Sequence, residues 1–175
     1  NLRKWIEEKG GCPIMWKTGH SYMKSKLRET NAVLAGEMSG HIFFNDQWYG
    51  FDDAVYAGAR LLSILARKES IQRFLKSLPD SSCTPELKMN IEGVSVKNIM
   101  SKLKSTQMFP RSIELNFIDG IRVEYQKGFG LVRPSNTTPS LVFRFEGDDL
   151  NSLEQIKYEF RVAMKQVLPH IETPF

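Results

Sequence analysis

The chain has 175 residues, of which 41% are hydrophobic and 25% are charged. This length fits one large domain or two small ones, and these proportions are those of a folded protein rather than a disordered one. No apolar run approaches the roughly 18 residues that a membrane-crossing helix needs, and residues 1–9 are charged rather than signal-like. We therefore expect a cytoplasmic protein without a membrane partner.

The net charge of +4 comes from the beginning of the chain. Residues 1–36 hold seven Lys and Arg against three acids, whereas residues 79–175 hold twelve of each. A nucleic-acid binder usually has a denser basic stripe with aromatics between the charges, so a small anionic ligand fits better than a nucleic acid. Weak nucleic-acid binding through the basic segment remains an alternative. Cys12 and Cys83 provide neither a disulfide framework nor a zinc site.

The first 78 residues alternate between helical and strand-like patterns. The expected elements are a helix that ends at Gly10, a buried strand at 13–16, a helix capped by Ser21 and running to about Glu29, a strand at 33–35, a helix capped by Asp52 or Asp53, and a short helix from Ser70 to near Leu78. This rhythm predicts an α/β domain over residues 1–78, with a parallel or mixed sheet and flanking helices. Because no strand precedes the first helix, we expect this domain to be partial.

Residues 79–85 (PDSSCTP) are rich in turn formers and form the expected linker. The pattern changes after it. The expected elements are a helix over about 97–105, alternating strands between 112 and 132 with a hairpin turn at Asp119-Gly120, a strand at 141–145, and a helix over about 150–168. They predict an α+β domain over 86–175, in which helices cover an antiparallel sheet.

Two polar, glycine-containing segments follow expected strands in the first domain: KTGH at 17–20 and GEMSGH at 36–41. Because ligands bind beyond the carboxyl ends of strands in α/β sheets, these segments should share one rim. Glu37, Ser39 and His41 combine a carboxylate, a hydroxyl and an imidazole, which together suit the vicinal hydroxyls of a sugar. The alternative is a solvated turn.

A third polar segment, RPSNTTP at 133–139, contains many hydrogen-bond donors and no acid. The Arg133 guanidinium and the hydroxyl, amide and backbone groups after it would suit an oxyanion such as phosphate; the alternative is a polar hairpin loop. Lys17 and His20 should lie near a helix N-terminus, where anions bind, although such residues in a loop are often only solvated. The aromatic residues Trp48, Tyr49 and Phe51 are expected in the core.

Together these segments resemble the α-D-phosphohexomutase superfamily, and specifically its phosphomannomutase/phosphoglucomutase branch. GEMSGH resembles the family's sugar-binding loop and RPSNTTP its phosphate-binding loop, while WKTGHS at 16–21 and WYGFDD at 48–53 also fit. Met38 favours this branch, since phosphoglucosamine mutases, the alternative within the superfamily, typically have Gln there.

The resemblance implies a four-domain parent enzyme whose third domain, without its opening strand, and fourth domain lie in this chain. The parent would be an isomerase that interconverts the 1-phosphate and 6-phosphate of mannose or glucose through a bisphosphorylated sugar and an enzyme phosphoserine. The phosphoserine and the Mg²⁺ site would lie in the N-terminal domains of the same polypeptide. No catalytic nucleophile, metal site or bound cofactor is therefore expected in this chain, which alone should be inactive.

The resemblance also implies the roles of particular residues. Substrate contacts would come from Lys17, His20, Glu37, Ser39 and His41, and phosphate contacts from Arg133, Ser135, Asn136 and Thr137. The place of His41 beside the sugar-binding loop suggests a proton-transfer role for it. Because the phosphate-binding loop lies on a separate domain beyond the linker, we expect rotation of that domain to open and close the cleft. The rival interpretation is a non-catalytic sugar-phosphate-binding module.

Overall fold

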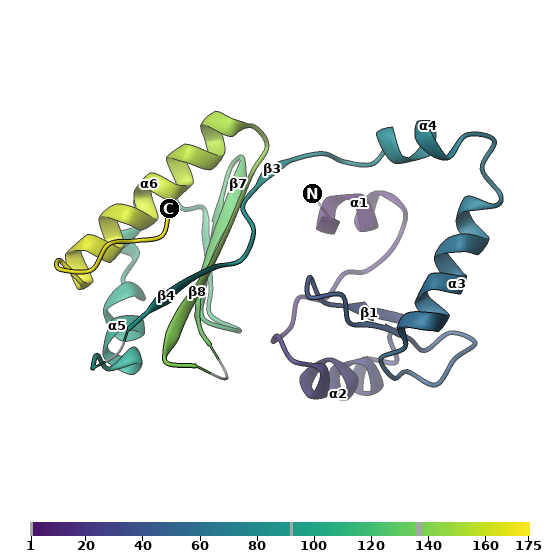
Figure 1. Ribbon diagram of the computed structural model, residues 1–175, viewed down its shortest axis with the longest axis horizontal. Coiled ribbons are helices and arrows are strands. Elements are labelled where there is room, and N and C mark those ends of the chain that lie inside the picture. Colours follow the sequence, from purple (N-terminus) through teal and green to yellow (C-terminus); the bar gives the residue numbers. More distant parts are fainter. Residues whose placement is uncertain (1, 92, 136–137) are drawn as a thin grey trace. The chain divides into compact units, whose positions relative to one another are not determined.

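The computed structural model describes residues 2–91, 93–135 and 138–175, and the chain separates into two compact units over residues 1–79 and 80–175 (Figure 1). The first is an α/β unit and the second combines an antiparallel sheet with helices, as the sequence predicts. The first unit contains α1 (Leu2–Glu8), α2 (His20–Thr30), β1 (Leu34–Gly36), β2 (Ile42–Phe44), α3 (Ala54–Leu65) and α4 (Ile71–Lys76).

A short hairpin forms the centre of the first unit. Strands β1 and β2 pair antiparallel, with Gly36 opposite Ile42, so residues 37–41 are the hairpin tip. The Glu37 amide donates to the His41 carbonyl (2.9 Å), and Gly40 closes the turn with a φ of +94°, which glycine adopts without steric cost. Phe43 of β2 is fully buried. The strands therefore hold the 36–41 loop in a fixed shape.

The strand expected at 13–16 does not form. Ile14 and Met15 are 53% and 41% exposed rather than buried. A strand needs a neighbour to accept and donate its backbone hydrogen bonds, and the described residues of the first unit provide only the β1–β2 pair. That pair is antiparallel, so the parallel pairing expected here is not present either.

Helix starts in the first unit follow local hydrogen bonding. The Asp53 side chain caps α3 by accepting from the Tyr56 amide (2.9 Å), and Ser70 caps α4, as predicted. The prediction that Ser21 caps α2 was wrong. Gly19 occupies the cap position with a φ of +130° and no side chain, so the helix already includes His20 and Ser21 lies within its first turn.

The aromatic residues of the 48–51 loop are not in the core. Trp48 stacks on Tyr56 of α3, with ring centroids 4.2 Å apart, and is half-buried. Tyr49 and Phe51 are 77% and 43% exposed, which corrects the prediction that they are core residues. In this loop it is Trp48 that packs against α3, through Tyr56.

The second unit contains β3 (Ser82–Cys83), β4 (Leu87–Asn90), α5 (Val96–Leu103), the 3-10 helix η1 (Thr106–Met108), β5 (Glu114–Asn116), β6 (Ile121–Tyr125), β7 (Gly128–Pro134), β8 (Ser140–Gly147) and α6 (Leu150–Val167). The strands pair antiparallel in the order β3-β8-β7-β6-β5, and β4 also pairs with β8. Strand β3 lies inside the expected 79–85 linker, because Ser82 and Cys83 pair with Gly147 and Glu146. These residues therefore belong to the sheet of the second unit.

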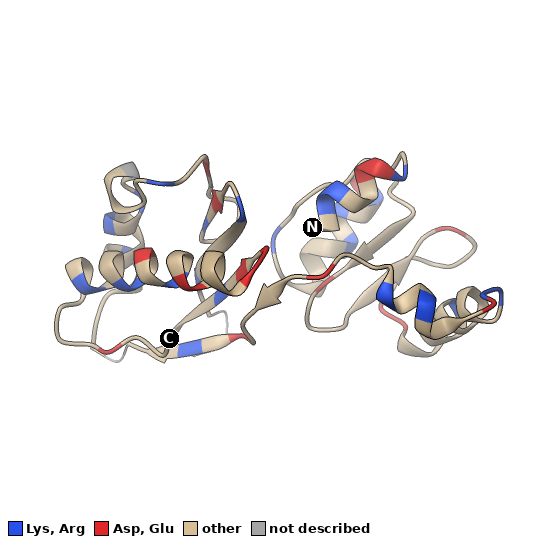
Figure 2. Cartoon of the chain, turned by 90° about the horizontal axis from the view of Figure 1, so that it is seen from above, with Lys and Arg blue, Asp and Glu red and all other residues tan. Residues whose placement is uncertain are grey.

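Helices α5 and α6 lie on one face of this sheet (Figure 1). Alternate residues of β6, β7 and β8 point into the core that these helices close. Its fully buried members include Ile121, Val123, Val132, Phe143, Phe145, Phe160 and Ala163. Full burial of each large side chain contributes about 1.5–3 kcal/mol, so this core provides the rigid base for the loops at the strand ends. Charged residues of both signs occur on both units (Figure 2).

The close approach of α6 to the sheet requires glycine at position 130. A Cβ there would overlap the ring of Phe160. We expect Gly130→Ala to lower the free energy of unfolding of the second unit by about 1–3 kcal/mol, the usual cost of overpacking. The measurement is urea unfolding followed by far-UV circular dichroism.

Gly58→Ala is the matched control, since a Cβ at Gly58 in α3 meets no atom within 4 Å. It should be neutral or stabilise by up to about 1 kcal/mol. All three tryptophans lie in the first unit, so tryptophan fluorescence monitors that unit separately. A Gly130→Ala protein that unfolds like Gly58→Ala would contradict the packing argument.

Candidate functional site

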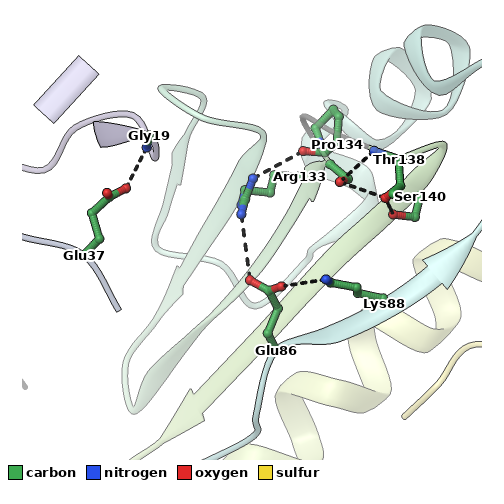
Figure 3. A network of polar contacts seen from close by, with 9 residues as sticks. Gly19, Glu37, Glu86, Lys88, Arg133, Pro134, Thr138 and Ser140 are labelled. Atoms are coloured by element: carbon green, nitrogen blue, oxygen red, sulfur yellow. Dashed lines mark hydrogen bonds and ion pairs between the residues drawn. The ribbon is translucent and has the colours of Figure 1, made fainter. Parts of the chain in front are cut away.

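A hydrogen bond joins the two polar segments of the first unit. The Gly19 amide donates to Oε1 of Glu37 at 2.6 Å, which joins the 17–20 segment to the 36–41 loop (Figure 3). The other carboxylate oxygen, Oε2, is buried and has no hydrogen-bond partner among the described residues. Leaving a buried acceptor unsatisfied costs about 1–3 kcal/mol. A ligand hydroxyl that donates to this oxygen would remove that cost.

His41 ends the same loop and is held by a carboxylate. Its Nδ1 lies 2.5 Å from Oδ2 of Asp52, while Oδ1 of Asp52 accepts from the Ile42 amide at 3.1 Å. The hydrogen bond with His41 is the main cause that lowers the pKa of Asp52 below its usual value. An ionised Asp52 requires Nδ1 to carry the proton, so in the neutral imidazole Nε2 is the acceptor.

Asp52 is a site residue that the sequence interpretation missed. The sequence offered Asp52 and Asp53 as alternative helix caps and as part of the family-like segment at 48–53, without a site role for either. Because Asp53 fills that role, Asp52 is left to face His41. Two consecutive acids before a helix were the available signal, since only one of them can cap it.

The loop that carries Asp52 is anchored to α3. Arg60 donates from both terminal nitrogens to the Asp46 carboxylate, at 3.0 and 2.9 Å. This bidentate geometry is the strongest arrangement of an Arg–carboxylate pair, and the hydrogen bond from Arg60 lowers the pKa of Asp46. Trp48 adds a bond from Nε1 to Asp53 at 3.2 Å. Asp52, the partner of His41, therefore lies in a loop that the contacts of Asp46 and Trp48 hold in place.

The other candidate residues of the first unit lie at the surface. His20 begins α2, and its ring centroid is 6.4 Å from that of His41. The Lys17 ammonium lies 5.8 Å from the centre of the Tyr22 ring, and Ser39 is exposed at the hairpin tip. The structure thus brings Gly19 to Glu37 and His20 to His41. Lys17 and Ser39 are exposed.

The 133–139 loop connects β7 to β8 in the second unit. The Ser135 amide donates to the Ser140 carbonyl (2.9 Å), and the Ser135 hydroxyl accepts from the amide and the hydroxyl of Thr138 (3.3 and 3.0 Å). A further hydroxyl contact joins Thr138 to Ser140 (Figure 3). Asn136 and Thr137, two of the predicted phosphate contacts, lie outside the described residues. The described part of the loop is therefore ordered by its own hydroxyl groups.

Arg133 stands at the end of β7 with its side chain only 13% exposed. Its Nη1 donates to the Pro134 carbonyl at 3.4 Å, and its Nη2 lies 3.8 Å from Oε2 of Glu86. Glu86 precedes β4 and lies far from the loop in the sequence. The RPSNTTP segment itself contains no acid, so its sequence could not reveal this carboxylate. The fold brings a carboxylate to an otherwise basic and hydroxyl-rich site.

The described ranges also give information on metal-ligand clusters, thiols and membrane-spanning helices. They contain no group of three or more His, Cys, Asp or Glu that could hold a metal ion. Cys12 and Cys83 are exposed free thiols. Among the helices that the structure describes, none combines the length and the apolar character needed to cross a membrane.

Family comparisons agree with the architecture and define the class of protein. Residues 1–81 match the model for phosphoglucomutase/phosphomannomutase, alpha/beta/alpha domain III, and residues 85–163 match the model for the phosphoglucomutase/phosphomannomutase C-terminal domain. The chain therefore belongs to the phosphoglucomutase/phosphomannomutase family, which confirms the resemblance found in the sequence.

Individual relatives show how much of such a protein the chain represents. It is 47% identical over 174 residues to the phosphoglucomutase of Neisseria gonorrhoeae, and 44% identical over 175 residues to the phosphomannomutase/phosphoglucomutase of Pseudomonas syringae pv. tomato. These matches cover 99% of the chain but 38% and 37% of the relatives. The fold matches a crystal structure of a phosphoglucomutase/phosphomannomutase family protein from Burkholderia thailandensis with a TM-score of 0.91 and 52% identity, covering 100% of this chain and 37% of that one. The chain thus corresponds to a little over a third of these proteins.

The Asp52–His41 contact should make stability depend on pH. A carboxyl whose pKa is lower in the folded than in the unfolded state stabilises the fold above its unfolded value of about 3.9, and this contribution disappears as the pH falls through the lowered pKa. Asp52→Asn should therefore be less stable than wild type at pH 6, with the difference shrinking towards pH 2. Urea midpoints from tryptophan fluorescence measure it.

A double-mutant cycle with His41→Asn isolates the contact. The coupling energy between the two positions should be favourable at pH 6 and close to zero at pH 2. Equal coupling at both pH values would show that the two side chains do not interact as an ion pair.

Proposed function

We propose that the chain forms the sugar-binding and phosphate-binding part of a hexose phosphate mutase. The whole protein would be an isomerase that interconverts the 1-phosphate and the 6-phosphate of glucose or mannose. The observation that supports this most directly is the Glu37 carboxylate, which has one oxygen fixed by the Gly19 amide and the other buried without a described partner. Such a group is preorganised to accept a hydrogen bond from a ligand.

The 36–41 loop would bind the hydroxyls of the sugar. Glu37 can only accept, whereas the hydroxyl of Ser39 can donate and accept. A pair of such groups can bind two neighbouring hydroxyls whichever of them is closer to the reacting end. This property matters in a mutase, because the bisphosphorylated intermediate must turn around between the two transfers.

The 133–139 loop would hold the phosphate that is not reacting. Arg133 offers a planar set of N–H donors, and Ser135 with the two residues after it adds hydroxyl, amide and backbone donors. Hydrogen bonds to a charged acceptor contribute about 1.5–3 kcal/mol each. Each loop would fix one kind of substrate group, and such positioning provides much of the catalysis in phosphoryl transfer.

His41 would assist proton transfer in this scheme. As a sugar hydroxyl attacks a phosphoryl group, the O–H bond breaks and its proton needs an acceptor. Nε2 of His41 can accept it, because Asp52 keeps the other ring nitrogen protonated. The phosphoserine that gives and receives the phosphoryl group, and the Mg²⁺ that would stabilise its charge, would come from N-terminal domains outside this chain. The chain alone would bind hexose phosphates without turning them over.

A non-catalytic sugar-phosphate-binding module is the second candidate, since both loops bind rather than react. Activity of the whole protein distinguishes the two. A full-length protein that interconverts glucose 1-phosphate and glucose 6-phosphate, in the presence of Mg²⁺ and a bisphosphate activator, would be the mutase. Binding of the sugar phosphates without turnover would identify the module.

Arg133→Ala tests the phosphate assignment. In the full-length protein it should weaken binding of glucose 1-phosphate about 10-fold to 150-fold, because one charged hydrogen-bonding group is lost. Isothermal titration calorimetry measures the change. The control is Arg67→Ala, which removes an exposed arginine in the turn after α3 and should leave affinity unchanged. Wild-type affinity in Arg133→Ala would remove Arg133 from the site.

Glu37→Gln tests the sugar assignment. The amide keeps the size of the side chain, but one of the two acceptor oxygens becomes a donor. We expect kcat/KM of the full-length mutase to fall roughly 10-fold to 1,000-fold, as for loss of a preorganised polar contact. Glu29→Gln on α2, where the carboxylate pairs only with Lys26 among the described residues, is the control. Unchanged turnover in Glu37→Gln would argue against the sugar-loop role.

A further inference from the structure

The guanidinium of Arg133 lies between two acceptors from different parts of the chain. Nη1 donates to the Pro134 carbonyl at 3.4 Å, and Nη2 faces Oε2 of Glu86 at 3.8 Å (Figure 3). The other Glu86 oxygen, Oε1, lies 3.6 Å from the Lys88 ammonium. Glu86 is therefore flanked by two cations, one on each oxygen.

The strand register explains why these charges meet. Val142 of β8 lies opposite Arg133 of β7 on one side and opposite Lys88 of β4 on the other. Because side chains alternate between faces along a strand, Glu86 and Lys88 share a face of the sheet, and the register puts Arg133 on it. The opposite face carries the core under α5 and α6. The fold itself thus places the carboxylate beside the arginine of the 133–139 loop.

We propose that Glu86 is a positioning residue for Arg133, a role that rests on the proposed phosphate-binding function. An arginine recognises phosphate through the direction of its planar N–H donors, so the orientation of that plane decides how well it binds. Contacts at both terminal nitrogens fix the plane before the ligand arrives. The conformational entropy of the Arg133 side chain is then already lost in the free protein, so ordering this side chain does not weaken binding.

The lengths of these contacts suit such a role. A separation of 3.8 Å is beyond the usual 2.7–3.2 Å of an N–H···O hydrogen bond, so Glu86 attracts the guanidinium through charge without a short bond. Because neither contact of Arg133 is short, its oriented N–H donors remain available to an anion. Lys88 holds the second oxygen of Glu86 and leaves the three-residue group with a net positive charge.

The sign of the effect separates positioning from simple charge. Glu86 is an anion near an anion site, so its charge alone opposes phosphate binding. If charge were its only effect, neutralising it would tighten binding. A positioning role predicts the opposite, because an unrestrained Arg133 must be ordered by the ligand.

The test uses glucose 1-phosphate and the full-length protein. Glu86→Gln should raise the dissociation constant about fivefold at 50 mM salt, and the effect should shrink at 500 mM salt, where the ion pair is screened. In turnover assays KM should rise by a similar factor, while kcat changes less than about twofold. Glu86→Asp, which keeps the charge, should restore part of the affinity. A Glu86→Gln protein that binds equally well or more tightly overturns the proposal.

Two controls keep this result separate from the phosphate assignment. Glu114→Gln makes the same charge change on β5, at the other edge of the sheet, and should leave affinity unchanged. If it weakened binding as much as Glu86→Gln, the effect would come from the net charge and not from the contact with Arg133, which would overturn the proposal. In an Arg133→Ala background, Glu86→Gln should no longer weaken binding, because only the opposing effect of the Glu86 charge is left to remove. If Arg133→Ala alone leaves binding intact, the phosphate-binding function fails. If it weakens binding while Glu86→Gln does not, only the positioning role fails.

Discussion

The hydrogen bond from the Gly19 amide to the Glu37 carboxylate is the constraint on which the first unit's site depends. It joins a loop before α2 to the tip of the β1–β2 hairpin, two segments that no strand pairing connects directly. It also fixes one oxygen of the carboxylate, while the other is buried without a partner among the described residues. Gly19, with a φ of +130°, is also the N-cap residue of α2.

Both loops use the same physical arrangement. In each, a basic group of a hairpin loop is oriented by a carboxylate from a different element: Asp52 holds His41, and Glu86 faces Arg133. In each, the carboxylate has its own support, the Ile42 amide for Asp52 and the Lys88 ammonium for Glu86. In the proposed function, His41 and Arg133 would thus be held in place before a ligand binds.

The sequence predicted features that depend on neighbouring residues and missed those that depend on register. The helix caps Asp53 and Ser70 and the turn at Asp119-Gly120 were right, because their hydrogen bonds or dihedral angles are local. The strand at 13–16 was wrong, because a strand requires a partner. The partners of His41 and Arg133 were missed for a related reason. Asp52 lies 11 positions from His41 in the sequence and Glu86 lies 47 positions from Arg133, and only the folded chain brings each pair together. The family resemblance identified the loops and included the segment that carries Asp52, but it assigned no role to Asp52 or Glu86.

Helix α3 has a practical consequence for work with this chain by itself. None of its residues is buried, and Val55 and Leu62, two turns apart on one side, are 85% and 68% exposed. An exposed apolar stripe of this kind promotes aggregation at the millimolar concentrations used for crystallisation or NMR. Glutamine or lysine at these two positions would improve solubility and keep good helix formers in place, while both loops retain their native side chains.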